Sequence, residues 1–208
     1  LLPGCAGIKV FMGSSTGSLL VDDDKGVARV LANIRRRAAF HSEDEAMLRE
    51  RANLRVPGDP SSHTVWRSAE VAMRCTERLV GIARETGARI HVLHVSTAGE
   101  MRFLREHKDV ASVEVTPHHL TLVAPDAYAR LGAYAQMNPP IRDETHRAAV
   151  WEGVKQGIAD ILGSDHAPHA REEKERAYPE THSGMTGVQT LVPVMLDHVN
   201  AGRLTLER

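Results

Sequence analysis

The chain has 208 residues, of which 42% are hydrophobic and 25% are charged, a composition typical of a globular rather than a disordered protein. Its 26 basic and 27 acidic residues give a formal net charge of −1, which argues against a nucleic-acid partner held by phosphate charge. No stretch reaches the roughly 18 apolar residues of a membrane span. The two cysteines form no CxxC, which excludes a disulfide scaffold and favours a reducing, cytoplasmic location.

Short apolar segments alternate with amphipathic segments along the chain. The apolar segments predict strands at 6–12, 38–41, 89–95, 112–116 and 160–164. The amphipathic segments predict helices at 25–37, 43–55, 65–86, 98–107, 143–156 and 187–201. Such alternation indicates an α/β fold, in which a parallel sheet is covered by helices.

Several helix boundaries carry local signals. Gly87 follows the third predicted helix, Thr97 and Glu100 have the spacing of a capping box, and Asp143 can cap the helix after it. Five strands fit an open sheet or part of a (β/α)8 barrel, because a complete barrel needs about 250 residues and eight strands. The first residues already read as a strand and the last as a helix start, so we expect residues 1–208 to be the C-terminal part of one barrel domain.

Polar residues collect where the predicted strands end. The strings FHSED, HVLHVS, TPHH and GSDHAPH follow four of the strands and hold seven of the 12 histidines. The first strand carries Lys9 within the apolar string GIKVFM, where burial of an ammonium group is costly unless its charge is paired or removed. Because the strand ends of these folds share one rim, Lys9, His41, His94 and Asp165 are expected to converge there. Imidazole and oxygen ligands without thiolates suit zinc or a similar divalent ion.

Taken singly, these residues also have structural interpretations. His41 alone is more often a hydrogen-bonded side chain than a ligand, Lys9 can extend its ammonium group to solvent, and Asp165 can cap a helix. His91 and His94 differ in strand parity, so His91 is expected to pack toward the helices. The remaining histidines of the helices and loops are interpreted as solvated, namely His63, His107, His146, His182 and His198.

Seven strings occur in a fixed order along the chain: GIKVFMGSSTG, FHSED, HVLHVST, TPHHL, MNPPIR, GSDHAPH and SGMTGVQT. In this order they resemble the cyclic-amide hydrolases of the amidohydrolase superfamily, which include dihydroorotases, hydantoinases and allantoinases. MNPPIR followed by SDHAPH is most similar to the dihydroorotases. The resemblance covers essentially the whole chain and implies about strands 4–8 of an amidohydrolase barrel, with two zinc ions at the strand ends. The HxH pair of the superfamily's first strand does not occur in this sequence.

The resemblance also implies roles for particular residues. Lys9 matches the lysine that is carboxylated to a carbamate bridging the two metals. His41 and His94 match the ligands of the second metal, and Asp165 matches a ligand of the first metal that is also the general acid/base. The implied substrate-binding residues are Asn138, His169, Ser183 and Gly184, with a weaker match for Arg142.

The implied reaction is the reversible hydrolysis of the cyclic amide of dihydroorotate to N-carbamoyl-aspartate, in de novo pyrimidine biosynthesis. A hydantoinase or allantoinase with the same metal chemistry is one alternative. Another is an inactive dihydroorotase-like subunit that scaffolds aspartate transcarbamoylase, although such subunits usually lack the metal ligands that this sequence retains. The expected partner is a small-molecule substrate; a homodimer or a complex with aspartate transcarbamoylase is compatible with the resemblance.

Overall fold

The computed structural model describes residues 3–14 and 19–207 and contains a five-stranded sheet. All neighbouring strands are parallel, and their order in the sheet is their order in the chain. A doubly wound sheet would reverse its strand order at one point, so this unbroken succession is that of a barrel wall. The strands are β1 (Ile8–Phe11), β2 (Ala38–His41), β3 (Ile90–Val92), β4 (Ala111–Val115) and β5 (Ile161–Leu162).

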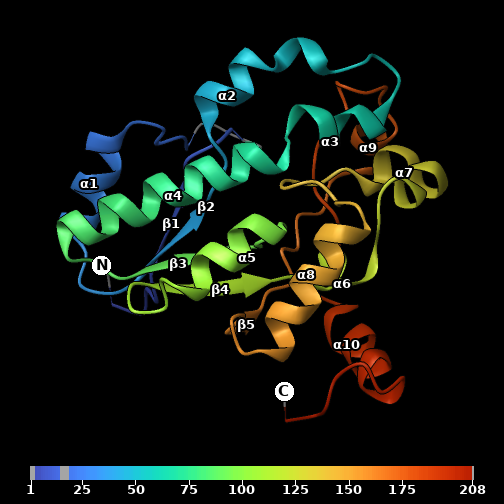
Figure 1. Ribbon diagram of the computed structural model, residues 1–208. Coiled ribbons are helices and arrows are strands. Elements are labelled where there is room, and N and C mark those ends of the chain that lie inside the picture. Colours follow the sequence, from blue (N-terminus) through green and yellow to red (C-terminus); the bar gives the residue numbers. More distant parts are fainter. Residues whose placement is uncertain (1–2, 15–18, 208) are drawn as a thin grey trace.

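Helical segments connect successive strands, and four of the helices pack side by side against the sheet (Figure 1). These four are α1 (Asp24–Ala32), α4 (Ala69–Thr86), α5 (Ala98–Arg105) and α8 (Glu144–Lys155). Shorter segments lie between them and after β5: α2 (Glu45–Glu50), η1 (Ala52–Leu54), η2 (Pro60–Ser62), α3 (His63–Trp66), α6 (Pro117–Thr121), α7 (Asp126–Leu131), η3 (Gly132–Ala135), α9 (Arg171–Lys174) and α10 (Leu191–Asn200).

The two faces of the sheet have opposite chemistry. One face carries four apolar residues that are register partners across β1 to β4, namely Val10, Phe40, Val92 and Val113. All four are buried in the main core together with apolar residues of the helices. The opposite face carries Lys9, Ala39, His91, Ser112 and Glu114. The strands therefore alternate in polarity, and their polar face lies on the side away from the helix layer.

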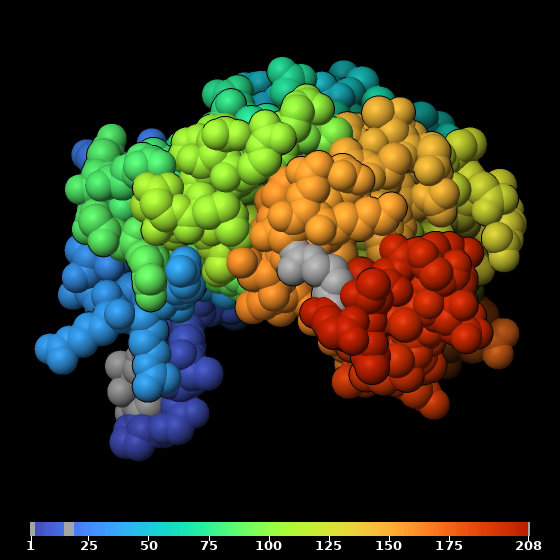
Figure 2. Space-filling model, turned by 60° about the horizontal axis from the view of Figure 1, so that its bottom comes forward, coloured from blue at the N-terminus to red at the C-terminus, as the bar shows by residue number. Residues whose placement is uncertain are grey.

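The fold class is confirmed, because the sheet is parallel, helix-covered and wound like part of a (β/α)8 barrel. In the space-filling view the molecule forms an arch whose legs are the N-terminal and C-terminal segments (Figure 2). Among the residues that the structure describes, no helix combines the length and the apolar character needed to cross a bilayer.

Several predicted elements differ from those observed. The predicted helix at 65–86 is two helices, α3 and α4, separated at Arg67, and the segment 43–55 is a short α2 followed by a 3-10 turn. The short helices after β4 were not predicted. The capping signals held at three places: Gly87 ends α4 with φ of 64°, the Thr97 hydroxyl accepts from the Glu100 amide, and Asp143 caps α8.

The prediction of a capping box at Thr97 was half correct. The Glu100 carboxylate does not bond the Thr97 amide; it accepts hydrogen bonds from the hydroxyls of Thr97 and Thr76 at 2.7 and 3.0 Å. Burial raises the pKa of Glu100, although both hydroxyls and Arg142 oppose that shift. Glu100 therefore ties α5 to α4 instead of closing its own helix end.

Gly13 provides a test of how tightly the strand ends pack. A Cβ atom on Gly13 would lie 2.6 Å from the Glu43 carbonyl oxygen, which is backbone and has little room to move. We expect Gly13→Ala to destabilise the fold by about 1–3 kcal/mol, as overpacking of a buried site usually does. Gly81→Ala is the matched control, since Gly81 is exposed on α4 with no atom within 4 Å of the added Cβ. Chemical denaturation measures both; an unchanged stability of Gly13→Ala would contradict the packing.

Candidate active site

One pocket of about 220 Å³ gathers the predicted site residues at the carboxyl ends of the strands. Larger hollows of about 690 and 750 Å³ lie elsewhere, one near the N-terminal segment and one beside α8 and α10. The chemistry of the lining, rather than its size, therefore distinguishes this pocket. Its walls are Lys9, Phe11, His41, His94, Asn138, Asp165, Ala167, Pro168, His169, Ser183 and Gly184.

The strand ends bring these residues together from distant parts of the sequence. Lys9 lies on β1 and His41 ends β2, while His94 and Asp165 follow β3 and β5. Within the described residues, His94 and Asp165 are the two non-glycine residues with positive φ, at 38° and 41°. A left-handed backbone is uncommon for such residues and concentrates at functional sites, where the surrounding structure holds it in place.

The imidazoles of His41 and His94 face each other. His41 Nδ1 lies 3.1 Å from His94 Nε2, and both side chains are almost completely buried. Burial lowers the pKa of His94 to about 4, so its ring is neutral at pH 7, as a metal ligand must be. His94 Nδ1 is buried, and it has no hydrogen-bond partner among the residues that the structure describes.

A buried carboxylate orients His41 from behind. Glu43 Oε2 lies 2.9 Å from His41 Nε2 and also contacts the guanidinium of Arg67. Burial would raise the pKa of Glu43, but Arg67 and His41 outweigh it and hold the pKa far below its usual range. A carboxylate on the distal nitrogen of a histidine fixes the ring and its tautomer in metal sites. Sequence reasoning missed Arg67, and it recorded Glu43 only as part of the string FHSED.

This donor set fits a divalent cation. Two nitrogens bound to one tetrahedral zinc at about 2.0–2.1 Å lie roughly 3.3 Å apart, close to the His41–His94 separation of 3.1 Å. Asp165 lines the same pocket. Burial favours its neutral form, but His94 and Lys9 outweigh that effect and lower the pKa of Asp165. Asp165 is therefore a carboxylate at neutral pH, able to bind a cation or accept a proton.

Lys9 differs from its expectation in one respect. Its side chain is exposed on the polar face of the sheet, where its ammonium group lies 4.7 Å from the centre of the Phe11 ring. The expectation that the Lys9 ammonium is buried was therefore wrong, and the alternative that it extends to solvent is the one observed. Lys9 nevertheless lines the pocket with His41, His94 and Asp165.

Two buried histidines bond the segment of the pocket wall that carries Asn138. His63 Nε2 lies 2.9 Å from Asn138 Oδ1 and 3.2 Å from the Met137 carbonyl, so it donates to acceptors on both. His119 Nε2 donates to the Pro139 carbonyl at 3.1 Å. Burial lowers the pKa of each histidine to about 3, so both rings are neutral. With Oδ1 occupied, the Asn138 amide NH2 remains available to a ligand.

Two further segments form the opposite wall. His169 Nε2 donates to the Ser183 carbonyl at 3.1 Å, and the Ser183 hydroxyl accepts from Gln136 Nε2 at 2.9 Å. Gly184 has φ of 151°, and a Cβ there would lie 2.5 Å from the Ala167 carbonyl oxygen. Only glycine permits this close approach, which brings the two segments together at the pocket.

Arg142 does not line the pocket. Its buried guanidinium donates to the Ser96 hydroxyl at 3.2 Å and to the Arg67 carbonyl. The structure therefore does not place Arg142, the weaker match among the implied substrate-binding residues, with the others. Arg142 belongs to the buried charge network around Glu43, which it reaches electrostatically.

The interpretations of three other histidines were also wrong. His63 and His198 are buried rather than solvated, because His63 supports Asn138 and His198 bonds Thr121 Oγ1 at 2.9 Å. His91 shares the polar face with Lys9 rather than packing toward the helices, and it bonds Ser112 Oγ at 2.8 Å. The parity argument failed because β3 ends at Val92, so alternation does not extend to His94.

Comparison with known proteins supplies the family. No family model matches the chain. The chain is 34% identical over 212 residues to the dihydroorotase of Halobacterium salinarum, and the aligned region covers 96% of this chain and 47% of that protein. It is 42% identical over 142 residues to the dihydroorotase of Pelotomaculum thermopropionicum, covering 66% of this chain and 33% of that protein. The chain thus spans about half the length, or less, of these curated relatives.

Solved structures agree with this fold. The L-hydantoinase (dihydropyrimidinase) from Arthrobacter aurescens superimposes with a TM-score of 0.88 at 26% identity, over 96% of this chain and 47% of that one. A D-hydantoinase superimposes with a TM-score of 0.86 at 22% identity, over 98% of this chain and 47% of that one, which supports the fold alone. Five parallel strands are thus matched to less than half of an amidohydrolase barrel. Sequence and fold together show that the chain belongs to the cyclic-amide hydrolases of the amidohydrolase superfamily.

Proposed function

We propose that this protein is a dihydroorotase, which interconverts dihydroorotate and N-carbamoyl-aspartate by opening and closing the cyclic amide of dihydroorotate. The observation that carries the proposal is that one pocket is lined by all of these residues: His41, His94, Asp165, Asn138 and His169. The similarity to curated dihydroorotases over 96% of the chain supports the same substrate. A hydrolysis assay with dihydroorotate, and the reverse assay with N-carbamoyl-aspartate, test the proposal directly.

We infer that Lys9, His41, His94 and Asp165 hold two zinc ions, with Lys9 carboxylated on its amine. Carbon dioxide would add to the neutral amine of Lys9 with loss of a proton, and the resulting carbamate would supply an anionic oxygen ligand on the β1 side of the pocket. Glu43 orients His41 through the bond to its Nε2. Zinc, when bound, makes the attacking water more acidic and polarises the scissile carbonyl.

Other steps of the reaction, proton transfer and substrate binding, are assigned to residues of this chain. The Asp165 carboxylate accepts the proton of the attacking water and delivers it to the leaving ring nitrogen. His169 and the Asn138 amide hold the substrate's carboxylate and ring amide, which fixes the ring relative to Asp165. The backbone at Ser183 and Gly184 closes on the ring from the opposite wall. His63 keeps Asn138 in the orientation that this binding requires, and His119 holds the Pro139 carbonyl next to it.

A hydantoinase-type cyclic amidohydrolase is the second candidate, and the close superposition on the Arthrobacter aurescens L-hydantoinase favours it. Both enzymes use the same bond cleavage, but hydantoin has no carboxylate like that of dihydroorotate. The preference between the two rings therefore separates the candidates. An inactive, scaffolding subunit would hydrolyse neither ring.

Asp165→Asn tests the proton transfer. The amide keeps the shape and an oxygen ligand but cannot accept the proton, and general acid/base catalysis is worth roughly 10²–10⁴-fold. We expect kcat to fall by at least about 10²-fold, and the acidic limb of the pH–rate profile to disappear, because that limb reports protonation of Asp165. Asp197→Asn, on the exposed side of α10, is the control. A wild-type kcat with unchanged metal content would show that Asp165 is not the acid/base.

Lys9→Ala tests the bridging ligand. Without the carboxylated amine we expect lower metal content and a loss of at least about 10²-fold in kcat/KM, since the substitution removes an anionic ligand from the site that activates water. Short carboxylic acids added with zinc should partly restore activity. Lys25→Ala removes an exposed lysine from α1 and should change neither property. Full activity and two metals per chain in Lys9→Ala would assign the bridge to another residue.

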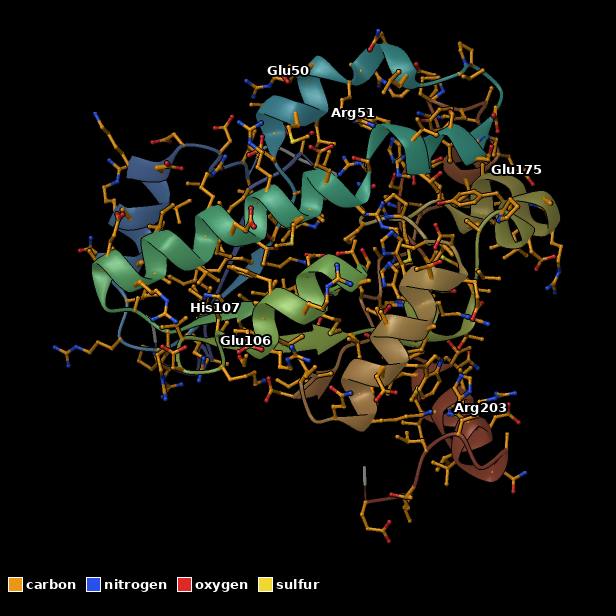
Figure 3. The ribbon with its side chains drawn as sticks, in the orientation of Figure 1. Glu50, Arg51, Glu106, His107, Glu175 and Arg203 are labelled. Carbon is orange, nitrogen blue, oxygen red and sulfur yellow. The ribbon has the colours of Figure 1, made fainter. Side chains whose placement is uncertain are left out.

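His169→Ala tests substrate selectivity. A site built to pair a polar group rejects analogues that lack it, because its own groups are then left unpaired. We expect the substitution to reduce turnover of dihydroorotate far more than turnover of hydantoin or unsubstituted dihydrouracil. His107→Ala is the control, because His107 lies beside α5, outside the pocket (Figure 3). Equal losses for all three rings would refute a role in carboxylate binding.

A further inference from the structure

A second group of side chains that could bind a metal lies at the rim of the pocket, and the proposed reaction uses only one of its members, His169. His169, Glu173 of α9 and His182 each offer a ligand atom, and these atoms all lie within 4.8 Å of one another. Glu173 and His182 do not line the pocket, whereas His169 does. The group therefore shares one residue with the proposed catalytic site and extends away from it.

The separations suit ligands of a single ion. His169 Nδ1 lies 3.3 Å from His182 Nδ1 and 3.5 Å from Glu173 Oε2, and His182 Nδ1 lies 3.6 Å from Glu173 Oε1. Ligand atoms around tetrahedral zinc, with bonds of about 2.0–2.2 Å, are separated by roughly 3.3–3.5 Å. Two histidines and a glutamate are also a known donor set for zinc.

The hydrogen bonds of His169 define which of its nitrogens faces the cluster. Nε2 lies 3.1 Å from the Ser183 carbonyl, which can only accept, so Nε2 carries the hydrogen. In the neutral ring Nδ1 is then a lone pair, and it points at His182 Nδ1 and the Glu173 carboxylate. A backbone carbonyl on the distal nitrogen is a usual orienting partner of a metal-bound histidine. The Ala170 amide likewise holds Glu173 Oε2, at 3.0 Å.

The scaffold around the cluster is fixed by bonds that do not involve the three ligands' donor atoms. The Ala167 amide donates to the Met185 carbonyl at 2.9 Å, which joins the two wall segments. The buried Lys174 ammonium donates to the carbonyls of His182 and Gly184 at 3.0 and 3.1 Å. The ligand atoms are thus positioned by the fold, so little ordering would be required on binding.

We propose that His169, Glu173 and His182 form a zinc site that joins residues 166–174 to residues 182–185 at the rim of the pocket. This site is separate from the ions proposed at the strand ends, which use Lys9, His41, His94 and Asp165. Three protein ligands leave a fourth position for water or another ligand. With Nε2 bonded to the Ser183 carbonyl and Nδ1 on zinc, His169 keeps no N–H for the substrate's carboxylate. The fourth position would then take that carboxylate in place of His169, an inference that rests on the proposed function. Zinc at this site clamps together the two segments that form one wall of the pocket.

The test is a titration of the purified protein with zinc chloride under a metal buffer, with bound zinc counted per chain by emission spectrometry. We expect His182→Ala and Glu173→Gln each to bind one zinc fewer than wild type, because each variant loses a direct ligand. If a variant still binds that zinc, we expect its affinity to be at least about tenfold weaker than that of wild type. Glu172→Gln is the matched control, since Glu172 is the exposed neighbour of Glu173. Equal zinc content and affinity in wild type and both ligand variants would overturn the proposal.

A second measurement needs no variant. Crystals of wild type grown with zinc chloride should show an anomalous peak among His169 Nδ1, His182 Nδ1 and the Glu173 carboxylate at the concentration that saturates the titration. The absence of that peak would also overturn the site. Neither measurement uses turnover, so a protein that fails to hydrolyse dihydroorotate would refute the proposed function while leaving this test decisive.

Discussion

The pairing of the buried Glu43 carboxylate with Arg67 is the interaction on which the candidate site depends. Glu43 is 0% exposed, and an isolated carboxylate in such surroundings costs several kcal/mol. The Arg67 guanidinium offsets that cost, and the remaining contact of Glu43 Oε2 is to His41 Nε2. The His41 ring is therefore fixed from behind, so that its Nδ1 faces His94. These two nitrogens are thus already oriented for binding a cation.

The same arginine connects parts of the chain that form different walls of the pocket. Arg67 also donates to the Ser14 carbonyl after β1, and its own carbonyl accepts from Arg142. This role explains why the long amphipathic segment breaks between α3 and α4, because Arg67 turns into the interior instead of continuing a helix. The break places His63 against Asn138. The side of the pocket proposed to bind metal and the side proposed to bind substrate are thus connected by one buried network.

The wall at 182–185 is organised by a different buried charge. The Lys174 ammonium donates to the carbonyls of Gln136, His182 and Gly184, at 3.3, 3.0 and 3.1 Å. Burial lowers the pKa of Lys174 to about 8, although the ammonium has three acceptors around it. This lysine holds the backbone at Gly184, where the chain approaches Ala167 too closely for any side chain. Both this wall of the pocket and the proposed rim zinc site depend on this arrangement.

The sequence by itself determined the alternation of strands and helices, the parallel sheet and the gathering of polar residues at one rim. These properties follow from local periodicity and from the geometry of parallel strands, whose carboxyl ends share an edge. Helix ends at Gly87 and Asp143 were equally predictable, because a cap acts within a few residues. Only the tertiary structure decided the burial of His63, the exposure of Lys9 and the face on which His91 lies. The buried His63 bonds Asn138, which is 75 residues away in the chain, and His91 lies beside Ala39 through the register of β2 with β3. Burial and register depend on contacts between distant segments, and no local pattern specifies which segments will meet.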